Sequence, residues 1–182
     1  RMTGHLPAPR QSIADVAFYV QAGTAIDQEA HSRATSVYFP DRAIPMLPDA
    51  LSNGICSLNP NEDRLTKTVA MEINGKGEVV RTRFFNSVIR SSERMTYTAV
   101  RRILVDHDPE HLERYRDLVN QFKLMEELAL LMYESRRARG NLDFDLPEAE
   151  IILDLQGMPE NIVRAERNIA HKLIEEFMLL AN

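Results

Sequence analysis

The stretch TKTVAMEINGKGEVVRTRFFNSVIR, residues 66–90, predicts a long β-hairpin. Its first part alternates between apolar and polar side chains, which puts Val69, Met71 and Ile73 on one face of a strand. Residues 74–77 (Asn-Gly-Lys-Gly) supply the turn, because asparagine and glycine both tolerate positive φ angles. We therefore expect the residues on either side of this turn to pair as antiparallel strands.

The sequence after this hairpin has a mainly helical pattern. Thr96 or Thr98 can cap a short helix. Asp108 and Pro109 form a start signal for the next helix, since aspartate accepts hydrogen bonds from unpaired N–H groups and proline fits the first helical position. Large apolar residues and alanine then recur at spacings of three and four: Leu112, Tyr115, Leu118, Phe122, Met125, Ala129 and Met132. This spacing predicts one long amphipathic helix that ends near Gly140.

Shorter elements are predicted on both sides of these two regions. The pattern of Ile13–Val20 predicts a strand, and Thr24 can cap a helix that follows. The proline-rich residues 39–64 predict an ordered loop with a single helical turn. A second hairpin is predicted over residues 149–164, and a final helix begins at about Glu166. This order of elements predicts an α+β fold, in which a mixed or antiparallel sheet with hairpins packs against long helices.

The composition allows one globular domain and sets limits on its partners. A chain of 182 residues with 44% hydrophobic and 27% charged residues is long enough and apolar enough to bury a core. Its net charge of −5 argues against a protein that coats nucleic acid with a basic surface. A locally basic channel for RNA is still compatible with that charge.

Several features favour a cytoplasmic protein without a membrane partner. The single cysteine, Cys56, excludes an internal disulfide and fits a reducing compartment. No apolar run approaches the roughly 18 residues that a spanning helix needs. Residues 1–12 lack the apolar core of a signal peptide, and they are aperiodic and proline-rich. We expect them to be a disordered lead-in or a remnant added for expression.

Two histidines have a spacing that is also found in metal-binding helices. His107 and His111 lie four residues apart. Pro109 places a helix start between them, so the two imidazoles need not share a face. We favour solvated histidines at a helix cap over a metal site.

Two acidic pairs are weaker candidates for metal binding. Asp143 and Asp145 would lie parallel on one face of a strand, and the neighbours Glu175 and Glu176 would lie about 100° apart on a helix. Neither pair can form a metal site alone, and exposed, solvated charge is the favoured interpretation for most of these four residues.

Three aromatic residues suggest contacts with single-stranded nucleic acid. Tyr38, Tyr97 and Phe144 each lie at the edge of a predicted element, beside polar or basic residues. RNA single strands are commonly bound by stacking their bases on such rings. From the residues alone, we favour the alternative that these rings form part of a partly buried core. Nearby arginines could contact phosphates or simply be solvated: Arg90, Arg94, Arg101 and Arg102.

The segment TSVYFPDRAIPMLPDALSNGICSLN, residues 35–59, resembles the core motif of the ribonuclease II / ribonuclease R family. These bacterial exoribonucleases degrade RNA from its 3′ end. Further segments resemble the same family in the same order, with a closer match to the ribonuclease R branch: residues 13–16, 90–97, 139–145 and 166–182. The resemblance implies that residues 13–182 are the central part of an RNB-type catalytic domain.

The resemblance also implies an activity and a set of RNA-binding residues. The parent protein is expected to hydrolyse single-stranded RNA processively from the 3′ end, to release nucleoside 5′-monophosphates, and to use Mg²⁺. Tyr38 and Phe144 match the aromatic residues that clamp the 3′-terminal bases in this family. Tyr97 and Glu175 match residues associated with the terminal nucleotides and with the preference for ribose.

The chain departs from the family pattern at the metal site. The family holds its catalytic magnesium with clustered aspartates upstream of the position of Ile13, where this chain has GHLPAPRQS. We therefore expect this chain to contain no catalytic or metal-binding residue, to bind no Mg²⁺ and to be inactive alone. The alternative is a non-catalytic RNA-binding or scaffolding derivative that has lost the aspartates. The coding sequence immediately upstream of Ile13 would distinguish the two.

Overall fold

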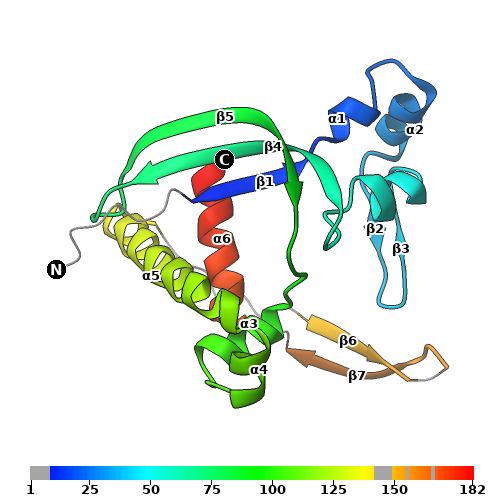
Figure 1. Ribbon diagram of the computed structural model, residues 1–182. Coiled ribbons are helices and arrows are strands. Elements are labelled where there is room, and N and C mark those ends of the chain that lie inside the picture. The colour runs from blue at the N-terminus through cyan, green and yellow to red at the C-terminus, as the bar shows by residue number, and fades with distance from the viewer. Residues whose placement is uncertain (1–8, 142–148, 155, 165–166) are drawn as a thin grey trace.

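The computed structural model describes residues 9–141, 149–154, 156–164 and 167–182. It combines a three-stranded antiparallel sheet with several helices and two short two-stranded hairpins. Figure 1 shows the longest helix lying beside the three-stranded sheet, while the two short hairpins project away from it. The predicted α+β class is confirmed.

The predicted long hairpin forms the centre of the sheet. Strand β4 (Asp63–Ile73) pairs antiparallel with strand β5 (Val79–Arg90). Gly77 in the connecting turn has a φ angle of +78°, and a Cβ added there would lie 3.1 Å from a side-chain carbon of Leu131. Both the backbone conformation and this close approach therefore favour glycine at the turn.

Strand β1 (Arg10–Ala14) lies on the other edge of β4 and runs antiparallel to it. The hydroxyls of Ser12 and Thr68 lie 2.7 Å apart across this pair of strands. Residues 10–12 therefore belong to the sheet, and the disordered lead-in predicted over residues 1–12 extended too far into the chain.

The strand predicted over Ile13–Val20 was wrong at both ends. The sheet pairing ends at Asp15, whose backbone N–H donates to the Leu65 carbonyl at 2.9 Å. The chain then turns into the short helix α1 (Val16–Tyr19). An apolar run as short as this one has no strand character of its own, and the position of the neighbouring strand decides where pairing stops.

The segment between α1 and the long hairpin forms small elements. Helix α2 (Ala25–Arg33) begins as predicted, because the Thr24 side chain accepts a hydrogen bond from the first helical turn. The proline-rich segment contains the predicted helical turn, η1 (Ala50–Ile55). It also contains a hairpin that was not predicted, made of β2 (Val37–Tyr38) and β3 (Ala43–Ile44).

The second half is helical as predicted, with one break. Thr96 caps helix α3 (Tyr97–Leu104). The long helix predicted from Pro109 is divided at Tyr115 into α4 (Pro109–Arg114) and α5 (Arg116–Ala138). The apolar spacing continues through Tyr115, and for that reason the sequence pattern did not reveal the break.

The last predicted hairpin and helix are also present. Strands β6 (Ala149–Leu153) and β7 (Pro159–Arg164) pair antiparallel and project from the molecule near α3 (Figure 1). Helix α6 (Ile169–Ala181) follows Asn168, whose side chain accepts a hydrogen bond from the Ala170 backbone N–H at 3.0 Å.

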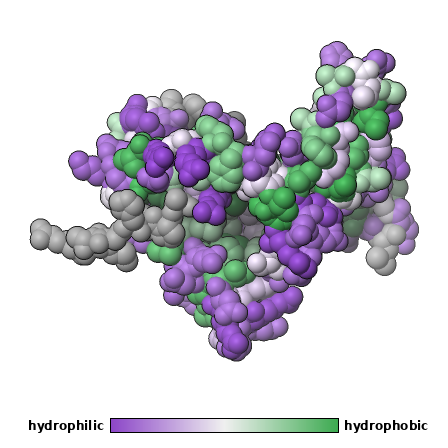
Figure 2. All heavy atoms as spheres, turned by 45° about the horizontal axis from the view of Figure 1, so that its top comes forward, coloured by the Kyte–Doolittle hydropathy of each residue, from purple (hydrophilic) through white to green (hydrophobic). Residues whose placement is uncertain are grey.

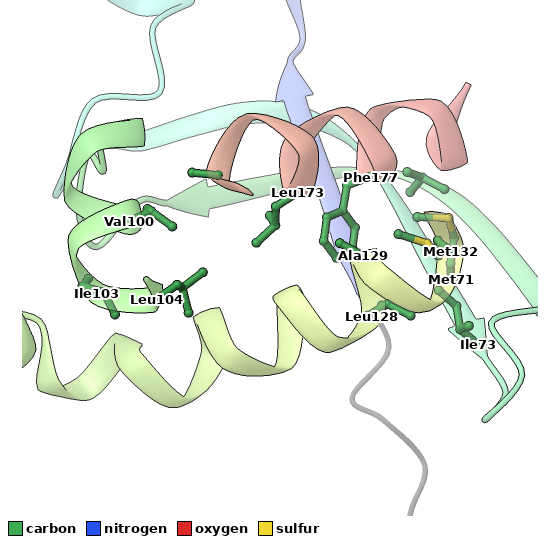
Figure 3. Packing of buried hydrophobic residues seen from close by; sticks show 12 residues of the cluster. Met71, Ile73, Val100, Ile103, Leu104, Leu128, Ala129, Met132, Leu173 and Phe177 are labelled. Atoms are coloured by element: carbon green, nitrogen blue, oxygen red, sulfur yellow. The ribbon is translucent and has the colours of Figure 1, made fainter. Parts of the chain in front are cut away.

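The hydrophobic core lies between β4 and the three helices α3, α5 and α6. As predicted, Val69, Met71 and Ile73 are buried together on one face of β4. Figure 3 shows Leu173 and Phe177 pointing from α6 toward α5, in the same cluster as the residues of β4 and the other helices. Those residues are Val100, Ile103, Leu104, Leu128, Ala129 and Met132.

Two leucines of α5 provide a matched test of this packing. Leu128 is 5% exposed and Leu130 is 48% exposed. We predict that Leu128→Ala lowers the free energy of unfolding by about 2–5 kcal/mol, because it leaves a cavity in the core. Leu130→Ala should change it by no more than about 0.5 kcal/mol. Urea unfolding followed by circular dichroism measures both values, and equal losses would contradict the packing.

Candidate nucleic-acid interface

Tyr97 is the first residue of α3, and its backbone is fixed by the preceding cap. The Ala99 backbone N–H donates to the Thr96 hydroxyl at 3.1 Å. The ring of Tyr97 stacks on the imidazole of His171, with centroids 3.9 Å apart and planes 24° apart. Tyr97 nevertheless remains 46% exposed. The ring is therefore supported by His171 on one side, while nearly half of the residue remains accessible to solvent.

Glu175 lies one turn after His171 on α6, so these two side chains share a face of the helix. Arg167 holds the Glu175 carboxylate in place, with Nη2 at 2.7 Å from Oε2. The structure thus brings Tyr97 and Glu175, two of the four predicted RNA-binding residues, to one region through His171.

Glu176 differs from its neighbour in burial and in role. It is only 5% exposed, and both of its carboxylate oxygens accept hydrogen bonds from the Arg136 guanidinium of α5. Glu176 is therefore an exception to the solvated charge expected for most of the four acidic residues. Neighbouring helix positions point about 100° apart, so Glu176 faces α5 while Glu175 pairs with Arg167.

Tyr38 lies in a different part of the molecule, on the projecting β2–β3 hairpin (Figure 1). It is 80% exposed, which excludes the alternative that it forms part of the core. The adjacent Phe39 is also exposed, and the Arg42 guanidinium lies 5.7 Å from the centre of its ring. Figure 2 shows apolar side chains scattered among polar ones over the part that carries α1, α2 and this hairpin.

Phe144, the other predicted clamp residue, lies outside the described residues, as do Asp143 and Asp145. The described residues therefore leave the predicted pair of Tyr38 and Phe144 untested. Figure 1 shows the β2–β3 hairpin well separated from the start of α3, so Tyr38 and Tyr97 do not form one cluster in this structure.

The candidate histidines at residues 107 and 111 do not converge on a common site. Nδ1 of His111 lies 2.5 Å from the carboxylate of Asp108, the residue that caps α4. Nδ1 of His107 instead lies 3.3 Å from the Ile103 carbonyl oxygen. Both histidines lie at the start of α4 as predicted, but the expectation of a solvated side chain was wrong for His111, whose side chain is only 16% exposed.

The described residues do not fit a magnesium centre. Across residues 9–141 and the three described segments after them, no group of three or more histidine, cysteine, aspartate or glutamate side chains could hold a metal ion. No step of catalysis can therefore be assigned to a metal held by these residues. A membrane-spanning helix is likewise absent from this part of the chain, since each described helix is too short or too polar.

His171 contacts Tyr97 but was not among the residues predicted from the sequence to bind RNA. A signal for its position was present, because Asn168 and His171 have the spacing of a helix cap and the third helical residue. Its contact with Tyr97 joins two distant parts of the chain, and periodicity gives no information about such pairs.

The RNB domain family model matches residues 12–182, so the chain belongs to the RNB domain family. Two curated relatives are named as ribonuclease R. Ribonuclease R 1 of Lactococcus lactis is 46% identical over 170 residues, which cover 93% of this chain and 21% of that protein. Ribonuclease R of Thermotoga maritima is 49% identical over 171 residues, covering 93% of this chain and 24% of that protein. The chain therefore spans less than a quarter of the length of either relative.

The fold matches a solved ribonuclease R. The structure of Mycoplasma genitalium RNase R in complex with ribose methylated single-stranded RNA aligns with a TM-score of 0.88 and 30% sequence identity. The alignment covers 98% of this chain and 28% of that one. The resemblance to the ribonuclease II / ribonuclease R family is thereby confirmed.

The two adjacent glutamates can be compared with one isosteric substitution. We predict that Glu176→Gln lowers the free energy of unfolding by about 3–5 kcal/mol, because it breaks the buried ion pair between Glu176 and Arg136. Glu175→Gln breaks a more exposed pair and should cost no more than about 1 kcal/mol. Chemical denaturation of both variants tests this contrast, and a loss at Glu175 as large as that at Glu176 would contradict it.

The cap of α4 predicts a dependence of stability on pH. The pKa of Asp108 is lowered from its ordinary value of 3.8, first by the hydrogen bond with the His111 side chain and then by that with the His111 backbone. A lowered folded-state pKa stabilises the protein above pH 3.8, and this contribution is lost as the pH falls through the folded-state pKa.

The stability difference between the wild-type chain and Asp108→Asn should therefore shrink as the pH is lowered below 3.8. Urea unfolding at a series of pH values measures this difference. Asp117→Asn is a suitable control, because it removes the same charge from a carboxylate that lies almost fully in solvent. A difference for Asp108→Asn that stays constant with pH would rule out the proposed origin of the shift.

Proposed function

We propose that residues 13–182 form the central part of the catalytic domain of a 3′-to-5′ exoribonuclease. The parent protein would hydrolyse single-stranded RNA processively, release nucleoside 5′-monophosphates, use Mg²⁺ and work in the cytoplasm. Membership of the RNB domain family and the relatives named ribonuclease R support this proposal. The observation that carries it is the half-exposed Tyr97 ring, supported by His171 in the same region as Glu175.

The proposed task of this chain is to hold the 3′ end of the RNA. The open face of Tyr97 is suited to stacking on a base, an interaction worth about 1–3 kcal/mol. Glu175 would accept a hydrogen bond from a ribose hydroxyl, the group that distinguishes RNA from DNA. Tyr38, with its ring exposed on the β2–β3 hairpin, would form the clamp on the terminal bases together with Phe144.

The proposed hydrolysis needs carboxylates that the described residues do not supply. A pair of metal ions that activates water and stabilises the leaving oxygen requires several carboxylates in one site. We assign none of the catalytic or metal-binding residues to this chain, and we expect it to release no nucleotide when it is isolated.

An assay with a 3′-labelled single-stranded oligoribonucleotide tests this function. With Mg²⁺, the full-length product of the gene should release labelled mononucleotide, and EDTA should abolish the release. The 182-residue chain should release none under the same conditions. Full-length protein that binds the RNA without cleaving it would favour a non-catalytic RNA-binding or scaffolding protein. Metal-dependent release by the 182-residue chain would contradict the proposal that it holds no catalytic or metal-binding residue.

The clamp makes a separate prediction in the full-length protein. Tyr38→Ala or Phe144→Ala should weaken RNA binding by about 1–3 kcal/mol, the scale of one lost stack. The shortest product should lengthen, because short oligomers have few other contacts. Phe144→Tyr, which keeps the ring face, is the control and should be nearly neutral.

Binding, end-product length and melting temperature are measured on the same variants. Because Tyr38 is exposed, its replacement by alanine should leave the melting temperature almost unchanged. An unchanged end product together with a large fall in melting temperature would end the clamp hypothesis for the residue concerned.

A further inference from the structure

His171 is held in one orientation at the start of α6. Its Nδ1 atom lies 2.9 Å from Asn168 Oδ1 and 3.3 Å from the Asn168 backbone nitrogen. Asn168 also accepts a hydrogen bond from the Ala170 backbone N–H, so the cap and the imidazole form one hydrogen-bonded unit. The helix cap therefore fixes the plane of the imidazole.

The fixed imidazole covers one face of the Tyr97 ring. Their centroid separation of 3.9 Å and interplanar angle of 24° describe a close, nearly parallel stack. Nearly half of the Tyr97 surface remains exposed although one ring face is covered. A ligand can therefore still reach a large part of this side chain, although His171 covers one of its ring faces.

The two rings meet because the hydrophobic core fixes the helices that carry them. Val100 and Ile103 of α3 and Leu173 and Phe177 of α6 are all buried in one cluster. Protein interiors are close-packed, so the starts of these two helices cannot shift independently. The stack is consequently present in the chain without RNA.

We infer that His171 is a positioning residue for RNA binding. It holds the Tyr97 ring in the orientation in which the open face stacks on a base. Glu175 lies one helical turn after His171 on α6, in the same region. The inference rests on the proposed function, since it requires Tyr97 to contact RNA. Its physical basis is preorganisation, because a ring that is already held loses less rotamer freedom when the ligand binds. His171 itself stays behind Tyr97 and touches no RNA.

Two substitutions separate the ring of His171 from its part in the helix cap. His171→Gln keeps a side chain that can complete a capping box at the third helical position, but it removes the ring. His171→Phe keeps a ring face for Tyr97 and removes the Nδ1 contacts with Asn168. A fluorescently labelled single-stranded oligouridylate is titrated into the 182-residue chain and each variant, and its fluorescence anisotropy reports binding.

We expect His171→Gln to raise the dissociation constant about threefold to tenfold, and His171→Phe to change it by less than about twofold. The melting temperature should show the opposite order, since only His171→Phe weakens the cap. If RNA affinity follows the melting temperature across the two variants, His171 has a purely structural role and the inference is overturned.

Tyr97→Ala distinguishes failure of this inference from failure of the proposed function. A Tyr97→Ala variant that binds weakly, beside a His171→Gln variant that binds normally, overturns the role of His171 alone. Unchanged binding by Tyr97→Ala, or no binding by the wild-type chain, overturns both. In the Tyr97→Ala background, His171→Gln should have no further effect. An additive loss there would mean that His171 contacts RNA directly and would overturn the positioning role.

Discussion

Burial of one face of β4 is the constraint on which the rest of the structure depends. Val69, Met71 and Ile73 are shielded from solvent because residues of α5 and α6 pack in the same cluster. Residues of α3 pack at one end of that cluster. This packing gives α6 a fixed position against α3. The starts of both helices consequently lie together, and the ring pair of Tyr97 and His171 follows from that arrangement.

An ion pair with α5 fixes the rotation of α6 about its own axis. Glu176 is buried against Arg136, so α6 can turn about its axis only by leaving a buried charge without its partner. With Glu176 facing α5, the helix geometry turns Glu175 toward Arg167 on a more exposed side. A stabilising ion pair and a candidate RNA contact thus occupy consecutive positions, and the first fixes the direction of the second.

Exposed aromatic rings are the feature on which the proposed contact with RNA depends. Most aromatic side chains gain stability by burial, whereas Tyr38 and Tyr97 keep much of their surface in solvent. They belong to different parts of the molecule, since one lies on a projecting hairpin and the other at a helix start fixed by the core. The chain belongs to the RNB domain family. Under the proposed function, these two rings would contact an RNA strand at separate points.

The sequence by itself determined the features that depend on near neighbours in the chain. The turn at residues 74–77, the caps Thr24, Thr96 and Asp108, and the buried face of β4 all follow from local backbone chemistry and periodicity. Motifs compared with a known family also identified Tyr38, Tyr97, Phe144 and Glu175 as candidate RNA contacts. Only the tertiary structure decided where β1 ends, that Glu176 is buried, and that His171 lies against Tyr97. These outcomes depend on partners far away in sequence, and local patterns do not encode which distant surfaces will meet.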